Sequence, residues 1–205
     1  MTNQPKIQLS TFERELVLNA NWILTKNGII QKTSLLLGTI AEEQKKIIEH
    51  SSLPQEAKNI SPKIAKGENY KGLPWLMLDH PRLFDKENIL AIRTMFWWGN
   101  FFSIALHLSG QYKKQYEQMI AGSYSSLKEQ DAYCCMHDDQ WEHHFEKNNY
   151  APVKELGEEI FKKTITGKDF IKLSKKHPLS EWDNTIRLLT NDFTLFLNIL
   201  GEYKV

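Results

Sequence analysis

The stretch that decides the fold runs from Asn88 to Gly110 and reads NILAIRTMFWWGNFFSIALHLSG. Two apolar runs meet at Gly99-Asn100, which is typical of a two-residue β-hairpin turn because glycine reaches positive φ without a steric cost. The runs are rich in Ile, Phe, Trp and Thr, which suit a pleated, half-buried surface. The sequence therefore predicts a central β-hairpin.

Two other structures compete for this stretch. A transmembrane helix is excluded, because the apolar run from Met95 to Leu108 is only about 14 residues long and a span needs roughly 20. A buried helix is the stronger competitor. The alternation from Phe102 to Leu108, together with the turn dipeptide, favours strands over that helix.

A two-residue turn would also fix the register of the hairpin. Trp98 is then expected opposite Phe101, and all other pairs follow from this one. One face mixes aromatic rings with hydrogen-bonding groups, whereas the other is apolar apart from Arg93. We expect helices on the apolar face and a concave site on the mixed face. The polar residues expected on the mixed face are Thr94, Ser103 and His107.

The remaining chain divides by its patterning. Helical spacing predicts two N-terminal helices separated at Asn27-Gly28, and a last helix that opens near Ser180 and ends at Gly201. A second hairpin is expected to turn at Asp138-Asp139, and a short helix to end before Pro178. We expect one domain, with a helical hairpin over 1–50, a loop over 51–72, a β-rich core over 73–146 and a helical part over 147–205.

This order of helices, strands and helices is typical of an α+β fold. We expect an antiparallel β-sheet built around the central hairpin (about 88–110) and packed with the N- and C-terminal helices. A chain of 205 residues buries roughly 70% of its unfolded surface and needs no disulfide to be stable.

Charge and cysteine usage limit the partners. The chain has 26 basic and 25 acidic residues and a net charge of +1, so no nucleic acid or anionic membrane is expected as a partner. Cys134 and Cys135 are adjacent, and a bridge between neighbours would be strained. With no signal-peptide pattern at the N-terminus, the expected location is the cytoplasm.

The segment from His137 to His144 is rich in residues that bind divalent metal ions. A site would need three or four of these side chains to converge, and the spacing does not enforce convergence. Solvated histidines at the end of a hairpin are the simpler interpretation. If there is a divalent metal cofactor, the candidate ligands are His137, Asp139 and His143.

Arg93 needs a partner, because a lone buried charge is very costly. An internal salt bridge to Asp79 or Glu87 would satisfy it. Alternatively, its guanidinium could bind the carboxylate or phosphate of a small anionic ligand through two hydrogen bonds.

Aromatic residues gather at the hairpin turn, more than one side of a core needs. If the turn projects, these rings form an exposed apolar patch and hence a homodimer interface. The expected interface residues are Trp97, Trp98, Phe101 and Phe102. Cys134 and Cys135 are expected to be buried and inert rather than nucleophilic.

Three functions remain open, and enzymatic activity is undecided among them. The first is a non-enzymatic protein that binds a small ligand or a protein partner on the mixed face, as a homodimer. The second is a metal-dependent hydrolase that uses the His137–His144 segment. The third is a structural module whose aromatic tip docks on another protein. The ligand-binding residues of the first are Arg93, Thr94, Ser103 and His107.

Overall fold

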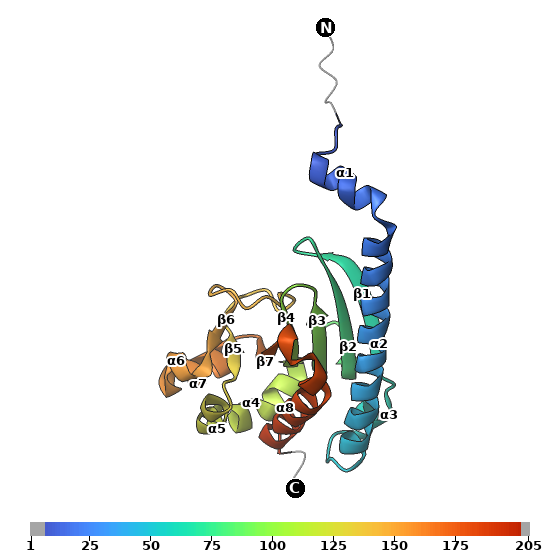
Figure 1. The fold of residues 1–205 in the computed structure, drawn as a ribbon. Coiled ribbons are helices and arrows are strands. Elements are labelled where there is room, and N and C mark those ends of the chain that lie inside the picture. The colour runs from blue at the N-terminus through green and yellow to red at the C-terminus, as the bar shows by residue number, and fades with distance from the viewer. Residues whose placement is uncertain (1–6, 202–205) are drawn as a thin grey trace.

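A seven-stranded antiparallel sheet lies at the centre of the computed structural model, which describes residues 7–201 (Figure 1). The strands occur in the order β1-β2-β3-β4-β7-β5-β6. Together with the helices at both ends of the chain, this sheet confirms the expected α+β class. The strands are β1 (Lys63–Tyr70), β2 (Leu73–Phe84), β3 (Ile89–Trp97), β4 (Phe101–Ser109), β5 (Tyr133–Cys135), β6 (Tyr150–Pro152) and β7 (Phe170–Pro178).

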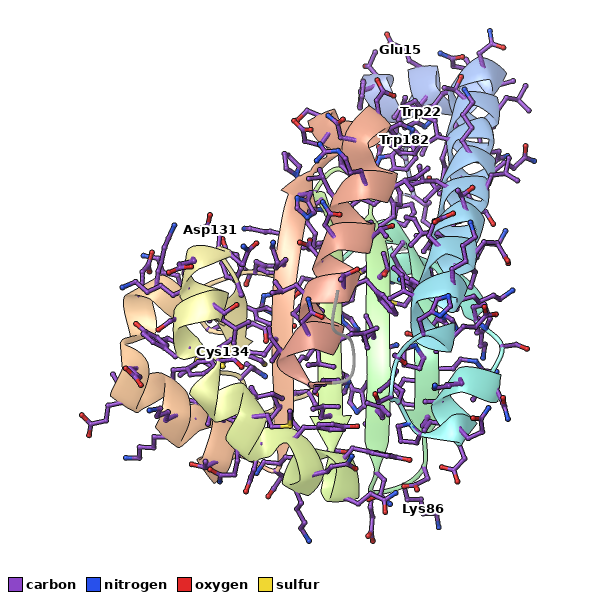
Figure 2. All side chains as sticks on the ribbon, turned by 90° about the horizontal axis from the view of Figure 1, so that it is seen from below. Glu15, Trp22, Lys86, Asp131, Cys134 and Trp182 are labelled. Atoms are coloured by element: carbon purple, nitrogen blue, oxygen red, sulfur yellow. The ribbon has the colours of Figure 1, made fainter. Side chains whose placement is uncertain are left out.

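Helices cover one face of this sheet, and three of them contact its strands most closely (Figure 2). These are α2 (Ala20–Glu49), α4 (Gly110–Gly122) and α8 (Thr185–Ile199), the last preceded by the 3-10 helix η1 (Leu179–Asn184). The others are α1 (Thr11–Leu18), α3 (Gln55–Asn59), α5 (Tyr124–Glu129), α6 (Val153–Leu156) and α7 (Glu158–Gly167). None of the helices within residues 7–201 has both the length and the apolar character needed to cross a bilayer.

The main core lies between the sheet and these helices. Alternate residues of β3 and β4 enter it from the sheet, and one stripe of each of α2, α4 and α8 enters it from the opposite side. Each fully buried Leu, Ile or Phe contributes about 1.5–3 kcal/mol relative to an exposed one. The strand residues are Leu90, Ile92, Phe96, Phe102, Ile104, Leu106 and Leu108, and the helix residues include Leu37, Ile40, Tyr116, Ile120, Leu189, Phe193 and Leu197.

The central hairpin is present, but its predicted register is wrong by one residue. Trp97 pairs with Phe101, so the connection has three residues instead of two. Gly99 takes the left-handed conformation with φ +70°, and the N–H of Trp98 donates to the carbonyl of Pro74 at 3.0 Å. Trp98 thus bonds to the neighbouring strand and not across the hairpin.

This shift changes which side chains share a face, because they alternate along a strand. Thr94 lies opposite Ile104 and faces the helices, whereas Arg93 shares the second face with Ser103 and His107. The sequence had placed Arg93 alone and Thr94 with those two residues. We call the side of the sheet away from α2, α4 and α8 the open face.

The N-terminal prediction of a helical hairpin is also wrong. The helix α2 continues through Asn27-Gly28, and the break falls earlier, at Asn19. The side chain of Asn19 accepts a hydrogen bond from the N–H of Trp22 at 3.3 Å, which is typical of a helix N-cap. One glycine costs a helix only about 1 kcal/mol, so it did not end this one.

Two segments that were predicted to be a loop and a helix each contain a β-strand. Within 51–72 lie α3 and the edge strand β1, whose mostly polar sequence hides the apolar alternation. The segment before Pro178 is the strand β7 and not a helix. Its Ile171 and Leu173 face the core, whereas Lys172 between them faces the other way and is 1% exposed.

The strand β2 passes through an irregularity between Asp79 and Arg82 and continues to Phe84. The predicted turn at Asp138-Asp139 is wrong. The strands β5 and β6 do pair, but the connection is the long loop 136–149 and not a turn at Asp138-Asp139. The final helix is present with Leu189, Phe193 and Leu197 buried, but α8 begins at Thr185, because the residues from Leu179 to Asn184 form the 3-10 helix η1.

Two glycines provide a test of this fold. Replacing Gly99 with alanine should destabilise the protein by about 1 kcal/mol, because alanine is strained at φ +70°. Gly38 lies inside α2, and a Cβ there meets nothing within 4 Å. Gly38→Ala should therefore stabilise the protein by about 0.5–1 kcal/mol. Urea denaturation midpoints measure both changes. A Gly99→Ala variant that is as stable as the wild type, or more stable, would contradict the assigned turn.

Candidate functional site

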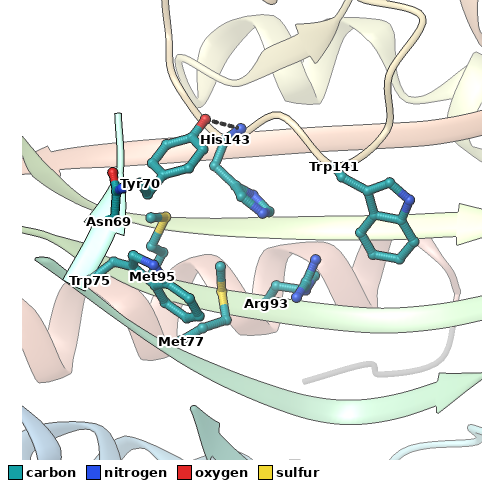
Figure 3. Close-up of a pocket in the computed structure, with 8 residues that line it drawn as sticks. All are labelled: Asn69, Tyr70, Trp75, Met77, Arg93, Met95, Trp141 and His143. Carbon is teal, nitrogen blue, oxygen red and sulfur yellow. Dashed lines mark hydrogen bonds between the residues drawn. The ribbon is translucent and has the colours of Figure 1, made fainter. Parts of the chain in front are cut away.

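The open face carries a cavity of about 260 Å³ (Figure 3). Its floor comes from β2 and β3, one side from the end of β1, and its roof from the loop 136–149. The cavity therefore combines residues that lie far apart in the chain. The lining residues are Asn69, Tyr70, Trp75, Met77, Arg93, Met95, Trp141 and His143.

The loop 136–149 is tied to the sheet by hydrogen bonds at two places. The buried ammonium of Lys172 donates to the carbonyls of Gln140 at 2.9 Å and Glu142 at 2.6 Å. The hydroxyl oxygen of Tyr70 accepts the N–H groups of His143 at 2.7 Å and His144 at 3.0 Å. These bonds give hydrogen-bond partners to backbone groups that would otherwise be unpaired, and they hold the roof in place.

Tyr70 has a further bond that fixes the rotation of its hydroxyl. It donates to a carboxylate oxygen of Glu142 at 2.8 Å. Burial, followed by this neighbouring carboxylate, raises the pKa of Tyr70 to about 12, although the two backbone donors act against that shift. The phenol is therefore neutral and serves as a wall and an anchor.

His107 supports the roof from below. Its Nε2 lies 2.8 Å from the side-chain oxygen of Gln140, and its ring lies edge-on to Trp141 with centroids 5.3 Å apart. Burial, followed by the charge of Lys172, lowers the pKa of His107 to about 3. The imidazole is thus neutral near pH 7 and acts as a rigid support rather than as an acid.

Arg93 is the charged residue of the cavity floor. Its Nε donates to Asp79 at 2.8 Å, so the predicted internal salt bridge is present, with Asp79 and not Glu87 as the partner. The guanidinium also lies over the rings of Phe84 and Trp141, at 5.6 and 5.5 Å from their centroids. Both side chains of the ion pair are largely buried.

The arginine nevertheless keeps unused hydrogen-bonding capacity. Its buried Nη1 makes no hydrogen bond to any described residue. An unpaired buried donor costs about 1–3 kcal/mol. Lys172 adds a second positive charge on the same face, with burial lowering its pKa to about 8. The cavity floor therefore offers an unpaired N–H donor to an anion.

The apolar wall depends on a glycine. A Cβ on Gly67 would lie 2.6 Å from the indole nitrogen of Trp75, so the ring lies directly against the backbone of β1. The neighbouring ring of Trp97 donates its N–H to the carbonyl of Tyr70 at 3.2 Å. Together with Met77 and Met95, these contacts give the cavity a flat apolar side.

The structure separates the four residues predicted to bind a ligand. Arg93 lines the cavity, whereas His107 lies beneath the roof and Ser103 is buried further along the open face. Thr94 faces the helices, where it is 3.5 Å from the side-chain nitrogen of Gln44. The wrong register accounts for its misplacement.

The residues predicted to bind a metal ion do not gather. No group of three His, Cys, Asp or Glu side chains able to hold a metal ion occurs within residues 7–201. Nδ1 of His137 accepts the N–H of Asp139 at 3.0 Å, and Asp139 in turn accepts the N–H of Trp141 at 2.8 Å. His137 and Asp139 thus shape the loop, whereas His143 points to the cavity.

The aromatic turn is not the exposed patch that the sequence suggested. Trp97 and Phe102 are buried, and Trp98 and Phe101 are half-buried against their neighbours. The premise of a projecting aromatic tip is therefore wrong. Cys134 is buried, and burial raises the pKa of its thiol to about 12, as expected for an inert cysteine.

Sequence reasoning missed Tyr70, Trp75, Met77 and Trp141. Trp75 and Met77 alternate on β2, and this period-two pattern could have marked them as sharing a face. Tyr70 ends β1 after an irregularity in the strand, and Trp141 lies in a loop, so no periodicity indicates which way either side chain points.

Comparisons of the chain with models of protein families, with curated proteins and with solved structures gave no match. The class of this protein is therefore assigned from its structure alone. It is an α+β protein with helices on one face of an antiparallel sheet and a roofed cavity on the other.

The buried neutral histidine predicts a pH dependence. Unfolded His107 takes up a proton near its ordinary pKa of about 6.5, whereas the folded residue does so only near pH 3. The unfolded state therefore binds more protons between these values, and stability is lost as the pH falls. His107→Gln should reduce the loss between pH 7 and pH 5 by about 2 kcal/mol.

Urea denaturation at the two pH values measures this difference. The control is His50→Gln, a substitution at an exposed histidine of α2's C-cap, which should leave the wild-type loss unchanged. An equal acid loss in wild type and His107→Gln would show that His107 is not held neutral.

Proposed function

We propose that this protein binds a small organic carboxylate with a flat apolar body in the cavity of the open face. The unpaired Nη1 of Arg93 carries the proposal, because it is a buried donor at a cavity walled by Trp75 and methionine side chains. Its Nε is already occupied by Asp79. A ligand oxygen would supply the hydrogen bond that Nη1 does not make in the protein.

The cavity suits a ligand of one ring with a short acidic side chain. A cavity of about 150 Å³ already holds benzene, and this one measures about 260 Å³. Trp75 and Trp141 offer flat rings, and Met77 and Met95 adapt to irregular shapes. Trp141 is 47% exposed as a residue, and its ring lies over the Arg93 guanidinium, so we infer that the ring turns aside when the carboxylate enters.

His143 supports selectivity within this proposal. Its pKa is lowered well below the ordinary value, by burial first and then by the charges of Lys172 and Arg93. A neutral imidazole at the cavity wall offers one donor and one acceptor. A ligand with a hydroxyl or carbonyl group beside its ring would use it.

The two alternative functions lack such support. A metal-dependent hydrolase would need His137, Asp139 and His143 on one ion, and the part of the chain that is described holds no such group. An aromatic docking module would need Trp97 and Phe102 at the surface, where they do not lie. For location we propose the cytoplasm, which is supported by two free, buried cysteines.

A matched set of ligands tests the proposal. Titration calorimetry would compare a panel of arylalkanoic acids, such as 3-phenylpropionate, with the corresponding uncharged amides. Each acid should bind at least about tenfold more tightly than its amide, because a hydrogen bond to a charged group contributes roughly 1.5–3 kcal/mol. Equal affinities, or no binding by any member, would contradict the proposed carboxylate site.

Conservative variants locate the binding. Arg93→Lys keeps the charge beside Asp79 but removes the Nη1 donor, so the preference for acid over amide should disappear. Arg82→Lys is the matched control, since Arg82 lies outside the cavity and bonds to the carbonyl of Ser61. It should bind the acids as the wild type does.

A further inference from the structure

The N-terminal arm, residues 9–24, projects from the body of the protein and buries none of its side chains (Figure 1). The helix α1 has no buried residue, and the first buried residue of α2 is Thr33. The arm begins with a complete capping box between Ser10 and Glu13. The start of α1 is therefore specified by its sequence although the helix has no interior to pack against.

Such an arm is not stable on local interactions alone. Isolated helices shorter than about 12–15 residues are marginal in water, and α1 has 8. Exposure of apolar side chains to water is unfavourable in free energy, and most of the apolar residues of the arm are large. The exposed fractions are 47% for Leu9, 66% for Phe12, 72% for Val17, 79% for Leu18, 49% for Trp22, 47% for Ile23 and 63% for Leu24.

We infer that the arm packs against the arm of a second copy of this chain, in a twofold dimer. The exposed parts of these seven side chains add up to on the order of 800 Å², about what one partner contributes to a standard interface. In a twofold interface one patch serves both copies, so a single apolar arm suffices. This inference is independent of the proposed carboxylate site.

Charge favours a second copy over a membrane. The described arm carries Glu13, Arg14 and Glu15, hence a net charge of −1 (one basic minus two acidic residues). A helix that lies on an anionic membrane has a basic polar face instead. The next charged residues are Lys26, which already pairs with Glu68, and the exposed Lys32. An arm that reaches Lys32 on the α2 of its partner therefore brings acidic groups toward a basic one.

Light scattering coupled to size exclusion tests this with the full chain at about 10 µM, a concentration well above the Kd of a stable dimer. The wild type should have twice the mass of one chain. Phe12→Asp with Leu18→Asp should give a monomer that still unfolds cooperatively, because neither side chain contacts the core. Val17→Ser with Leu18→Ser, which adds no charge, should also raise the dimer Kd at least tenfold.

The matched control is Ile160→Asp on α7, an apolar residue that is 54% exposed but lies away from the arm (Figure 1). It should remain a dimer. A wild-type monomer, or a dimer that survives both arm variants, overturns the inference. A wild-type monomer that sediments with vesicles of phosphatidylcholine and phosphatidylglycerol overturns it in favour of a membrane surface.

Discussion

The open face depends on two hydrogen bonds, which the buried ammonium of Lys172 donates to two carbonyls of the loop 136–149. Lys172 belongs to an interior strand, and a charge there is tolerated only because Gln140 and Glu142 replace its water shell. The same two bonds hold the loop that carries Trp141 and His143 over the sheet. Without them the cavity would lose its roof while the helix-covered core kept its packing.

The two faces of the sheet therefore have different roles, one in forming the core and the other in forming the cavity. The helix-covered face holds the apolar residues of β3 and β4 and accounts for most of the burial. The open face holds Arg93, His107 and Lys172, and the first two each keep one buried nitrogen without a hydrogen-bond partner among the described residues. Incomplete satisfaction of this kind is costly to stability and is typical of places that bind something.

Much of the fold could be predicted from local patterns, but the site could not. The strands around Gly99 and the stripe Leu189, Phe193 and Leu197 follow from alternation and helical spacing. The β-hairpin register depended on whether Trp98 pairs across the turn or bonds to Pro74, and that choice is made by the adjacent strand β2. One residue of register moved Thr94 away from Ser103 and His107.

Other errors share that origin, because the missing information was tertiary. Lys172 looks like a helix-surface residue in sequence, and only the carbonyls of a distant loop make a strand interior acceptable for it. Similarly, Arg93 could be expected to pair with Asp79, but nothing local indicates that Trp141 covers it. Long-range partners of polar groups decided the site, and periodicity does not report them.

The polar character of β1 has a consequence for how copies of the chain meet. An uncovered edge strand exposes backbone donors and acceptors that invite foreign strands, and charged side chains, lysine above all, are a common protection. Here Lys63, Lys66 and Glu68 are spread along that edge, and the ladder with β2 becomes irregular after Gly67. These features disfavour edge-to-edge pairing of β1 with strands of other copies. Specific assembly then depends on contacts between side chains rather than on exposed backbone groups.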